Sequence, residues 1–122
     1  MKMPVKCEPP ETGREVVQKW KKAMRFTPDL DERAMLLALL GQQTRIRLFY
    51  VLDRVGEVCV CDLAEILCVS QSAVSQHLAK LKAYGVVAAR RDNQTSFYAL
   101  ADKPEVKRLR KLAIEGIEGP TT

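Results

Sequence analysis

The chain has 122 residues, 47% of them hydrophobic and 29% charged, which is typical of one small globular domain and argues against a largely disordered protein. Its formal net charge of +5 favours an anionic partner. No apolar run approaches the roughly 20 residues that a membrane-spanning helix needs, and the first residues lack the apolar core of a signal peptide, so we expect a cytoplasmic protein. In a reducing cytoplasm its four cysteines would serve packing, metal binding or redox sensing rather than structural disulfides.

The first half of the chain predicts an arm followed by three helices. Residues 1–11 hold three prolines among charged residues, so we expect a flexible arm that carries Cys7. Apolar residues then recur at helical spacing in three segments, each of which ends at a turn or a glycine: about residues 12–24, 29–40 and 42–55.

The second half predicts a winged helix-turn-helix, a mostly α fold with a β-hairpin wing. The capping-box spacing of Asp62 and Glu65 predicts a short helix over residues 63–67, with a cysteine pair at or just ahead of its start. Ser70 is suited to cap a second helix after a tight turn. Two β-prone runs on either side of Asp92-Asn93-Gln94 then predict a hairpin. A last helix after residue 104 carries an apolar stripe, which would pack on the domain's own core or form part of a subunit interface.

The second helix of a helix-turn-helix enters the major groove of DNA, so its residues off the apolar stripe are candidate contacts. Glutamine can pair with adenine edges, and serine can bond to bases or phosphates. Basic and amide side chains at the hairpin are suited to phosphates or the adjoining minor groove. The alternative for each is a solvated polar surface. The candidate DNA contacts are Ser70, Gln71, Ser72, Ser75, Gln76, His77, Lys80, Arg90, Arg91 and Asn93.

Three segments of this half carry a family resemblance: EVCVCDLAEIL from Glu57, VSQSAVSQHLAKLKAYGVV from Val69, and RRDNQTSFYAL from Arg90. Over residues 36–101 the chain closely resembles the ArsR/SmtB family of bacterial metal-responsive repressors. One departure is LGQQTR from Leu40, where the family more often has an acidic residue and Asn before the arginine. The resemblance implies a homodimer, formed through the first and last helices, that binds palindromic operator DNA and leaves it when metal binds, so that efflux or detoxification genes are transcribed. Residues 12–119 would then be one DNA-binding and dimerisation domain, and residues 120–122 a frayed tail.

Thiolates are soft ligands, and Cys59 and Cys61 are close enough in sequence to share one ion. Two ligands make a weak site, and resemblance to the cadmium and lead sensors of the family implies Cys7 as the third, donated across the dimer. Cd(II) or Pb(II) is therefore the expected inducer, with As(III) and Zn(II) as alternatives. Ala64 stands where enterobacterial arsenite sensors have a third cysteine, and Pro104 stands where zinc sensors have a histidine. Cys68 is expected to pack rather than to bind metal.

Two other classes of function compete with this interpretation. A thiol-redox or sulfur-responsive repressor of the same fold would oxidise its cysteines instead, with Cys7 pairing with Cys59 or Cys61, because thiols only one residue apart bridge poorly. An enzyme is not expected, because the sequence has one histidine, no nucleophile and base pattern, and no glycine-rich phosphate loop.

Overall fold

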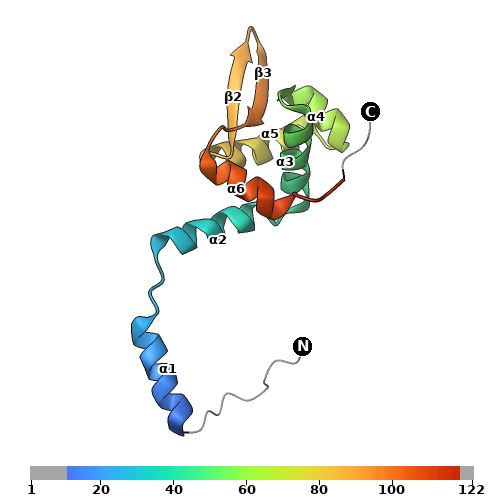
Figure 1. Ribbon diagram of the computed structural model, residues 1–122. Helices are drawn as coiled ribbons and strands as arrows, with labels where there is room; N and C mark the ends of the chain where they lie inside the picture. Colours follow the sequence, from blue (N-terminus) through green and yellow to red (C-terminus); the bar gives the residue numbers. More distant parts are fainter. Residues whose placement is uncertain (1–10, 119–122) are drawn as a thin grey trace. The chain divides into compact units, whose positions relative to one another are not determined.

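The computed structural model describes residues 11–118 of the chain (Figure 1). Residues 1–10 of the expected arm, which include Cys7, lie outside the described residues. The expected tail at residues 120–122 also lies outside them. The elements are α1 (Glu11–Ala23), α2 (Pro28–Leu40), α3 (Gln43–Val55), β1 (Val58–Cys59), α4 (Val60–Leu67), α5 (Gln71–Ala83), β2 (Val87–Asp92), β3 (Thr95–Leu100) and α6 (Pro104–Ala113).

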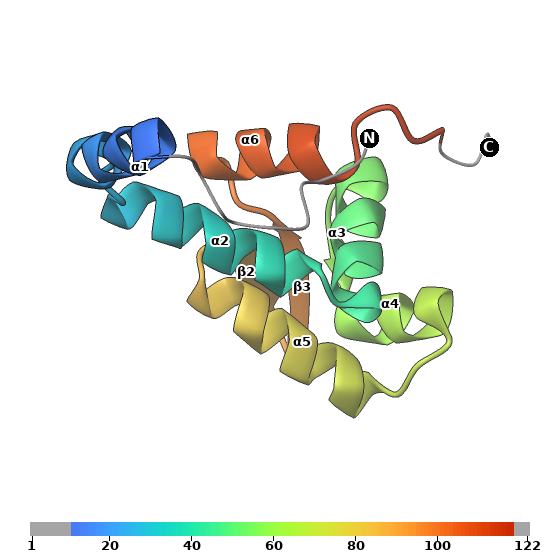
Figure 2. The same ribbon diagram turned by 90° about the horizontal axis from the view of Figure 1, so that it is seen from below.

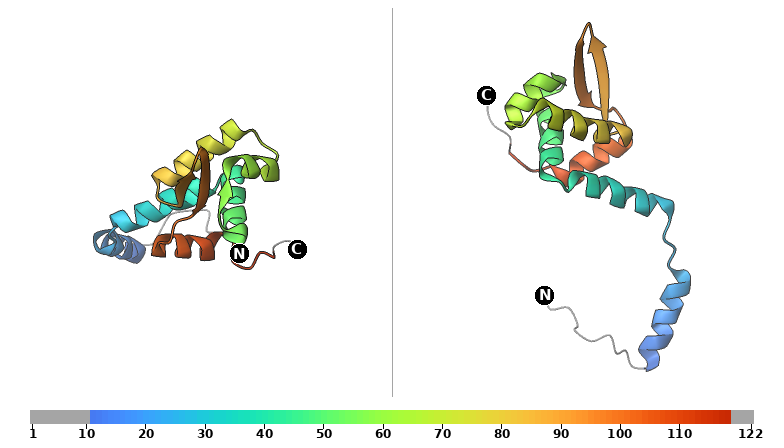
Figure 3. Two further views of the ribbon diagram at one scale, coloured as in Figure 1. Left: turned by 90° about the horizontal axis from the view of Figure 1, so that it is seen from above. Right: turned by 180° about the vertical axis from the view of Figure 1, so that it is seen from behind.

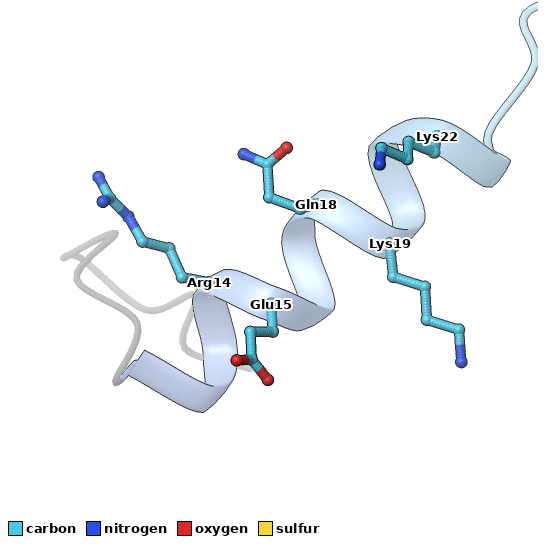
Figure 4. A pocket seen from close by; sticks show the side chains of 5 residues that line it. All are labelled: Arg14, Glu15, Gln18, Lys19 and Lys22. Atoms are coloured by element: carbon cyan, nitrogen blue, oxygen red, sulfur yellow. The ribbon is translucent and has the colours of Figure 1, made fainter.

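The chain divides after Asp31 into two compact units. The first unit contains α1, an amphipathic helix whose apolar side chains Val16, Val17 and Trp20 are half exposed, as is Met24 just after it. Figure 4 shows five polar side chains of α1 that line a shallow hollow: Arg14, Glu15, Gln18, Lys19 and Lys22.

The second unit is a winged helix-turn-helix, which confirms the predicted fold class. Helices α3, α4 and α5 pack around a core whose fully buried side chains include Phe49, Leu63 and Leu78. Strands β2 and β3 form a hairpin that projects from these helices as the wing (Figures 1 and 3). The hairpin turn follows from Asn93, which adopts the left-handed conformation with φ 57°, a region that asparagine tolerates better than most residues.

Helices α4 and α5 make the helix-turn-helix, joined by the short turn seen in Figure 2. The turn depends on Cys68, which ends α4 in the left-handed conformation with φ 56° and ψ 44°. Ser70 then caps α5 as predicted, because its hydroxyl accepts a hydrogen bond of 3.1 Å from the backbone N–H of Ala73. The apolar stripe of α5 is also as predicted: Val74, Leu78 and Leu81 are all fully buried.

The start of α4 differs from the prediction in two ways. The helix begins at Val60 rather than residue 63, so Asp62 lies in its first turn and is not its N-cap. The residue before the helix, Cys59, also belongs to a strand that the sequence did not reveal, because β1 pairs with β3 and extends the hairpin to a sheet of order β1-β3-β2. Both residues of β1 are buried, and a strand this short forms only because the free edge of β3 offers hydrogen-bond partners.

Helix α6 packs part of its apolar stripe on the core of its own unit. Val106 and Leu109 of the helix are buried, as is Ile114 directly after it, whereas Leu112 and the later Ile117 are exposed. An ion pair between Arg110 and Asp53 joins α6 to α3, with Nε to Oδ1 at 2.5 Å. The sequence alternatives for this stripe were the domain's own core and a subunit interface, and the buried half of the stripe corresponds to the first.

Candidate functional site

The cysteine pair of the second unit spans the junction between β1 and α4. Cys59 is the last residue of β1 and is buried, while Cys61 lies in the first turn of α4 and is exposed. Their Sγ atoms are 3.0 Å apart and share a hydrogen bond. The sequence placed both thiols at the amino end of this helix, and the structure brings them together there.

A carboxylate lies close to the two thiols. Donor atoms of Cys59, Cys61 and Asp62 all lie within 4.8 Å of one another. The sequence analysis missed Asp62 as a candidate ligand because its spacing to Glu65 suggested a helix cap. The early start of α4 turns this side chain toward the thiols instead.

The donor set fits a soft or borderline divalent ion. Two thiolates on one tetrahedral zinc ion lie about 3.8 Å apart, given Zn–S bonds of about 2.3 Å. The present separation of 3.0 Å is shorter than that value, and a rotation of the exposed Cys61 side chain would widen it. Sulfur donors favour ions such as Cd(II), Pb(II), Hg(II) or Zn(II) over hard ions.

The surroundings of Cys59 affect its protonation. The hydrogen bond between the two thiols raises the pKa of Cys59. Burial and the negative charge of Asp62 raise it further, whereas the hydrogen bond from the backbone N–H of Asp62 lowers it. Cys59 therefore holds its proton at neutral pH, and an ion that binds its sulfur must displace that proton.

A hollow beside the thiols collects negative charge. Its lining includes Cys59 and the ring of Phe97, together with three acidic side chains: Glu57, Asp62 and Glu65. Such a concentration of carboxylates favours a cation over an anion.

Arg90 of the wing forms an ion pair with Glu57, one of the acidic residues that line this hollow. Its Nε and Nη2 atoms donate to the two carboxylate oxygens of Glu57 at 3.0 and 2.7 Å, and its Cζ lies 4.9 Å from the centroid of the Phe97 ring. The Arg90 guanidinium also holds the pKa of the Glu57 carboxyl below its usual value. The sequence suggested Arg90 as a DNA contact, and in the structure its guanidinium is paired with Glu57.

The exposed face of α5 carries most of the remaining candidate DNA contacts. Its exposed members are Gln71, Ser72, Ser75, Gln76 and Lys80. Ser70 is exposed, but its hydroxyl accepts the capping hydrogen bond described above. His77 is half buried, and burial lowers its pKa, followed by the positive charges of Arg45 and Lys80. A lowered pKa keeps the imidazole neutral at pH 7.

The tip of the wing supplies the last two candidates. Arg91 and Asn93 are both exposed, and the Nε of Arg91 donates to the backbone carbonyl of Asn93 at 3.3 Å. The structure thus brings Gln76 and its neighbours together on one helix face and leaves Arg91 and Asn93 together on the hairpin.

Comparison with known proteins agrees with this geometry. The arsR family of bacterial regulatory proteins matches residues 42–89. The cadmium resistance transcriptional regulatory protein CadC homolog of Staphylococcus aureus is 34% identical over 103 residues, which is 84% of this chain and 84% of that protein. The chain belongs to the ArsR family. The ArsR-family relatives found in this way are named as transcriptional regulators. Within residues 11–118, no helix is long and apolar enough to cross a membrane.

Two solved structures show the same fold as this ArsR-family chain. Reduced HlyU from Vibrio cholerae N16961 is 36% identical, with a TM-score of 0.61, and the match covers 69% of this chain and 86% of that one. The homodimeric winged helix-turn-helix DNA-binding domain Mb0332 from Mycobacterium bovis is 30% identical, with a TM-score of 0.60, and the match covers 68% of this chain and 75% of that one.

Proposed function

We propose that the protein is a homodimeric repressor that binds operator DNA through α5 and the wing and releases it when a soft ion binds its cysteines. Release would allow transcription of genes for metal efflux or detoxification. The observation that carries the proposal is the pair of sulfur atoms 3.0 Å apart at the start of α4, the first helix of the helix-turn-helix. An ion there would bind at the start of the helix that directly precedes α5, the helix proposed to read DNA.

Cd(II) or Pb(II) is the inducer that the donor set favours, with As(III) and Zn(II) as alternatives. The name of the Staphylococcus aureus relative, a cadmium resistance regulator, supports the choice of Cd(II). Cys59 and Cys61 would hold the ion together with Cys7, which lies outside the described residues, and Asp62 is a further donor within them.

Ion binding would reach DNA through the position of the site. An ion that ties Cys7 of one subunit to the start of α4 in the other would change how the two α5 helices are presented to the operator. This is a coupling free energy between two sites, and about 1.4 kcal/mol corresponds to a tenfold change in operator affinity.

The test is operator binding followed by fluorescence anisotropy in buffer with controlled reductant. Cd(II), Pb(II), As(III) and Zn(II) would each be titrated into complexes of the wild type and of Cys7→Ser. We expect one soft ion to release the wild type and to lose this effect in Cys7→Ser. Wild-type protein that holds operator DNA equally well with and without every ion would refute the proposal.

A second candidate function is thiol-based redox sensing, which the similarity to reduced HlyU favours. Two thiols would lose two protons and two electrons to an oxidant such as hydrogen peroxide, which is reduced to water. Cys7 with Cys59 or Cys61 is the expected pair, because a disulfide between residues so close in sequence is strained. A non-reducing gel after mild peroxide treatment, compared with Cys7→Ser, separates this function from metal sensing.

A further inference from the structure

One row of side chains crosses the sheet from the wing to the thiols. Arg90 of β2 lies opposite Phe97 of β3, and Phe97 lies opposite Cys59 of β1. Directly opposed residues of antiparallel strands project from the same face of the sheet. The guanidinium, the aromatic ring and the thiol therefore share one face, and the contact of Arg90 with the Phe97 ring agrees with this.

The Arg90 side chain ends on the chain segment that carries the thiols. It crosses the ring of Phe97 and makes two parallel hydrogen bonds to Glu57, which precedes Cys59 by two residues. Such a forked arginine and carboxylate pair fixes direction as well as distance. An ion pair between side chains therefore joins the wing to the residues just before Cys59, in addition to the backbone pairing of β3 with β1.

Glu57 also shares a hollow with one of the two thiols. Glu57, Cys59, Asp62 and Phe97 line the same hollow. A divalent ion replaces the protons of the two thiols, so its complex with the two thiolates carries no net charge, and Glu57 would be drawn to it as a further oxygen donor from the same hollow. Arg90 would then lose the partner that holds it. The same carboxylate cannot keep both hydrogen bonds to Arg90 while it turns toward an ion.

We infer that Glu57 couples the thiol site to the wing: a soft divalent ion at Cys59 and Cys61 draws the Glu57 carboxylate into the hollow and loosens its hold on Arg90. The inference rests on the proposed function, because it needs an ion that binds the thiols. With the fork intact, the wing is held in one orientation before it meets DNA, and such preorganisation improves affinity. Without this ion pair, only the backbone pairing of the strands orients the wing, and operator affinity falls.

The chain offers a matched control for this residue. Glu57 and Glu65 both line the hollow, but within residues 11–118 only Glu57 is bonded to Arg90. Glu57→Gln and Glu65→Gln therefore remove the same charge from the same hollow, and they differ in the bond to the wing.

The first measurement follows the Arg90 Nε–Hε resonance by NMR in 15N-labelled protein, assigned with Arg90→Lys. We expect Cd(II) to shift this resonance in the wild type. Glu57→Gln should place it near the loaded position without any ion, and Glu65→Gln should leave it at the ion-free position of the wild type. An unchanged Arg90 resonance in Glu57→Gln would overturn the inference.

The second measurement is operator affinity by anisotropy with and without Cd(II), alongside ultraviolet absorption of the cadmium–thiolate bonds. Allosteric couplings typically change affinity by about 5–150-fold, and we expect Glu57→Gln to reduce the wild-type ratio of affinities by at least about threefold, with Glu65→Gln within about twofold of the wild type. A Glu57→Gln variant with the wild-type ratio would overturn the inference alone. Wild-type protein without thiolate absorption, or without release, would overturn the proposed function and this inference with it.

Discussion

The sulfur atoms of Cys59 and Cys61 lie 3.0 Å apart although one thiol is buried at the end of a strand and the other is exposed on a helix. The change from strand to helix between the two residues is what turns both side chains to one side. A regular strand would also place residues two apart on the same face, but with their side chains roughly 6–7 Å apart, too far to share an ion. The pair is therefore a product of the junction itself.

Replacing the exposed thiol tests this pair without disturbing the core. Cys61→Ser should abolish the ultraviolet absorption that Cd(II) produces on binding thiolates, and the operator complex should no longer respond to Cd(II). The control is Cys68→Ser, which changes another exposed thiol at the opposite end of α4. Loss of the response in both variants, or in neither, would contradict a site built on Cys59 and Cys61.

The salt dependence of operator binding tests the DNA face of α5. Lys80 is exposed on that helix, and we expect Lys80→Ala to weaken operator binding and to lower the slope of log affinity against log salt by about 1, because one phosphate contact is lost. Lys111→Ala, which removes an exposed lysine from α6, should leave the slope unchanged. Equal slopes for the two variants would place Lys80 away from the DNA.

The core beneath the thiol segment sets the stability of the second unit. Leu63 is fully buried in α4, so Leu63→Ala should lower the free energy of unfolding by about 2–5 kcal/mol through lost burial and a cavity. Ile66 on the same helix is 53% exposed, and Ile66→Ala should cost about 1 kcal/mol or less. Urea unfolding at one fixed protein concentration measures both, since dimerisation would make stability depend on concentration. Equal losses would mean that α4 packs differently.

The single histidine gives a direct measure of the electrostatics of α5. Burial and the charges of Arg45 and Lys80 lower the pKa of His77, so its NMR titration should have a midpoint below the usual 6.5, and Lys80→Ala should raise it. A base whose folded pKa is lowered binds its proton more readily in the unfolded chain. Its contribution to stability is therefore present above the unfolded pKa and is lost as the pH falls through the folded one. A midpoint at or above 6.5 in the DNA-free protein would contradict this environment.

Local patterns in the sequence were enough to predict the helix-turn-helix. The cap at Ser70 and the buried stripe of α5 depend on residues within a few positions of one another, and both are as predicted. The turn at Asn93 is of the same kind. Such features follow from backbone chemistry that a single segment carries by itself.

Features that join distant segments were missed. Strand β1 exists because β3, nearly 40 residues later, offers it an edge, and its two residues carry too little pattern to reveal it. The bond between Glu57 and Arg90 joins positions 33 residues apart. Arg90 therefore looked like a free cation at the wing, and Asp62 looked like a helix cap, until the junction between β1 and α4 was known.

The burial pattern of the wing bears on how a protein of this kind can evolve. In β2 only Val87 is buried, so substitutions along the rest of that strand cost the core little. Under the proposed function, substitutions in the hairpin would change operator preference, and substitutions around Cys59 would separately change ion preference. A substitution of Arg90 would affect both preferences at once, because its side chain belongs to the hairpin and contacts Glu57 and Phe97 beside the thiols.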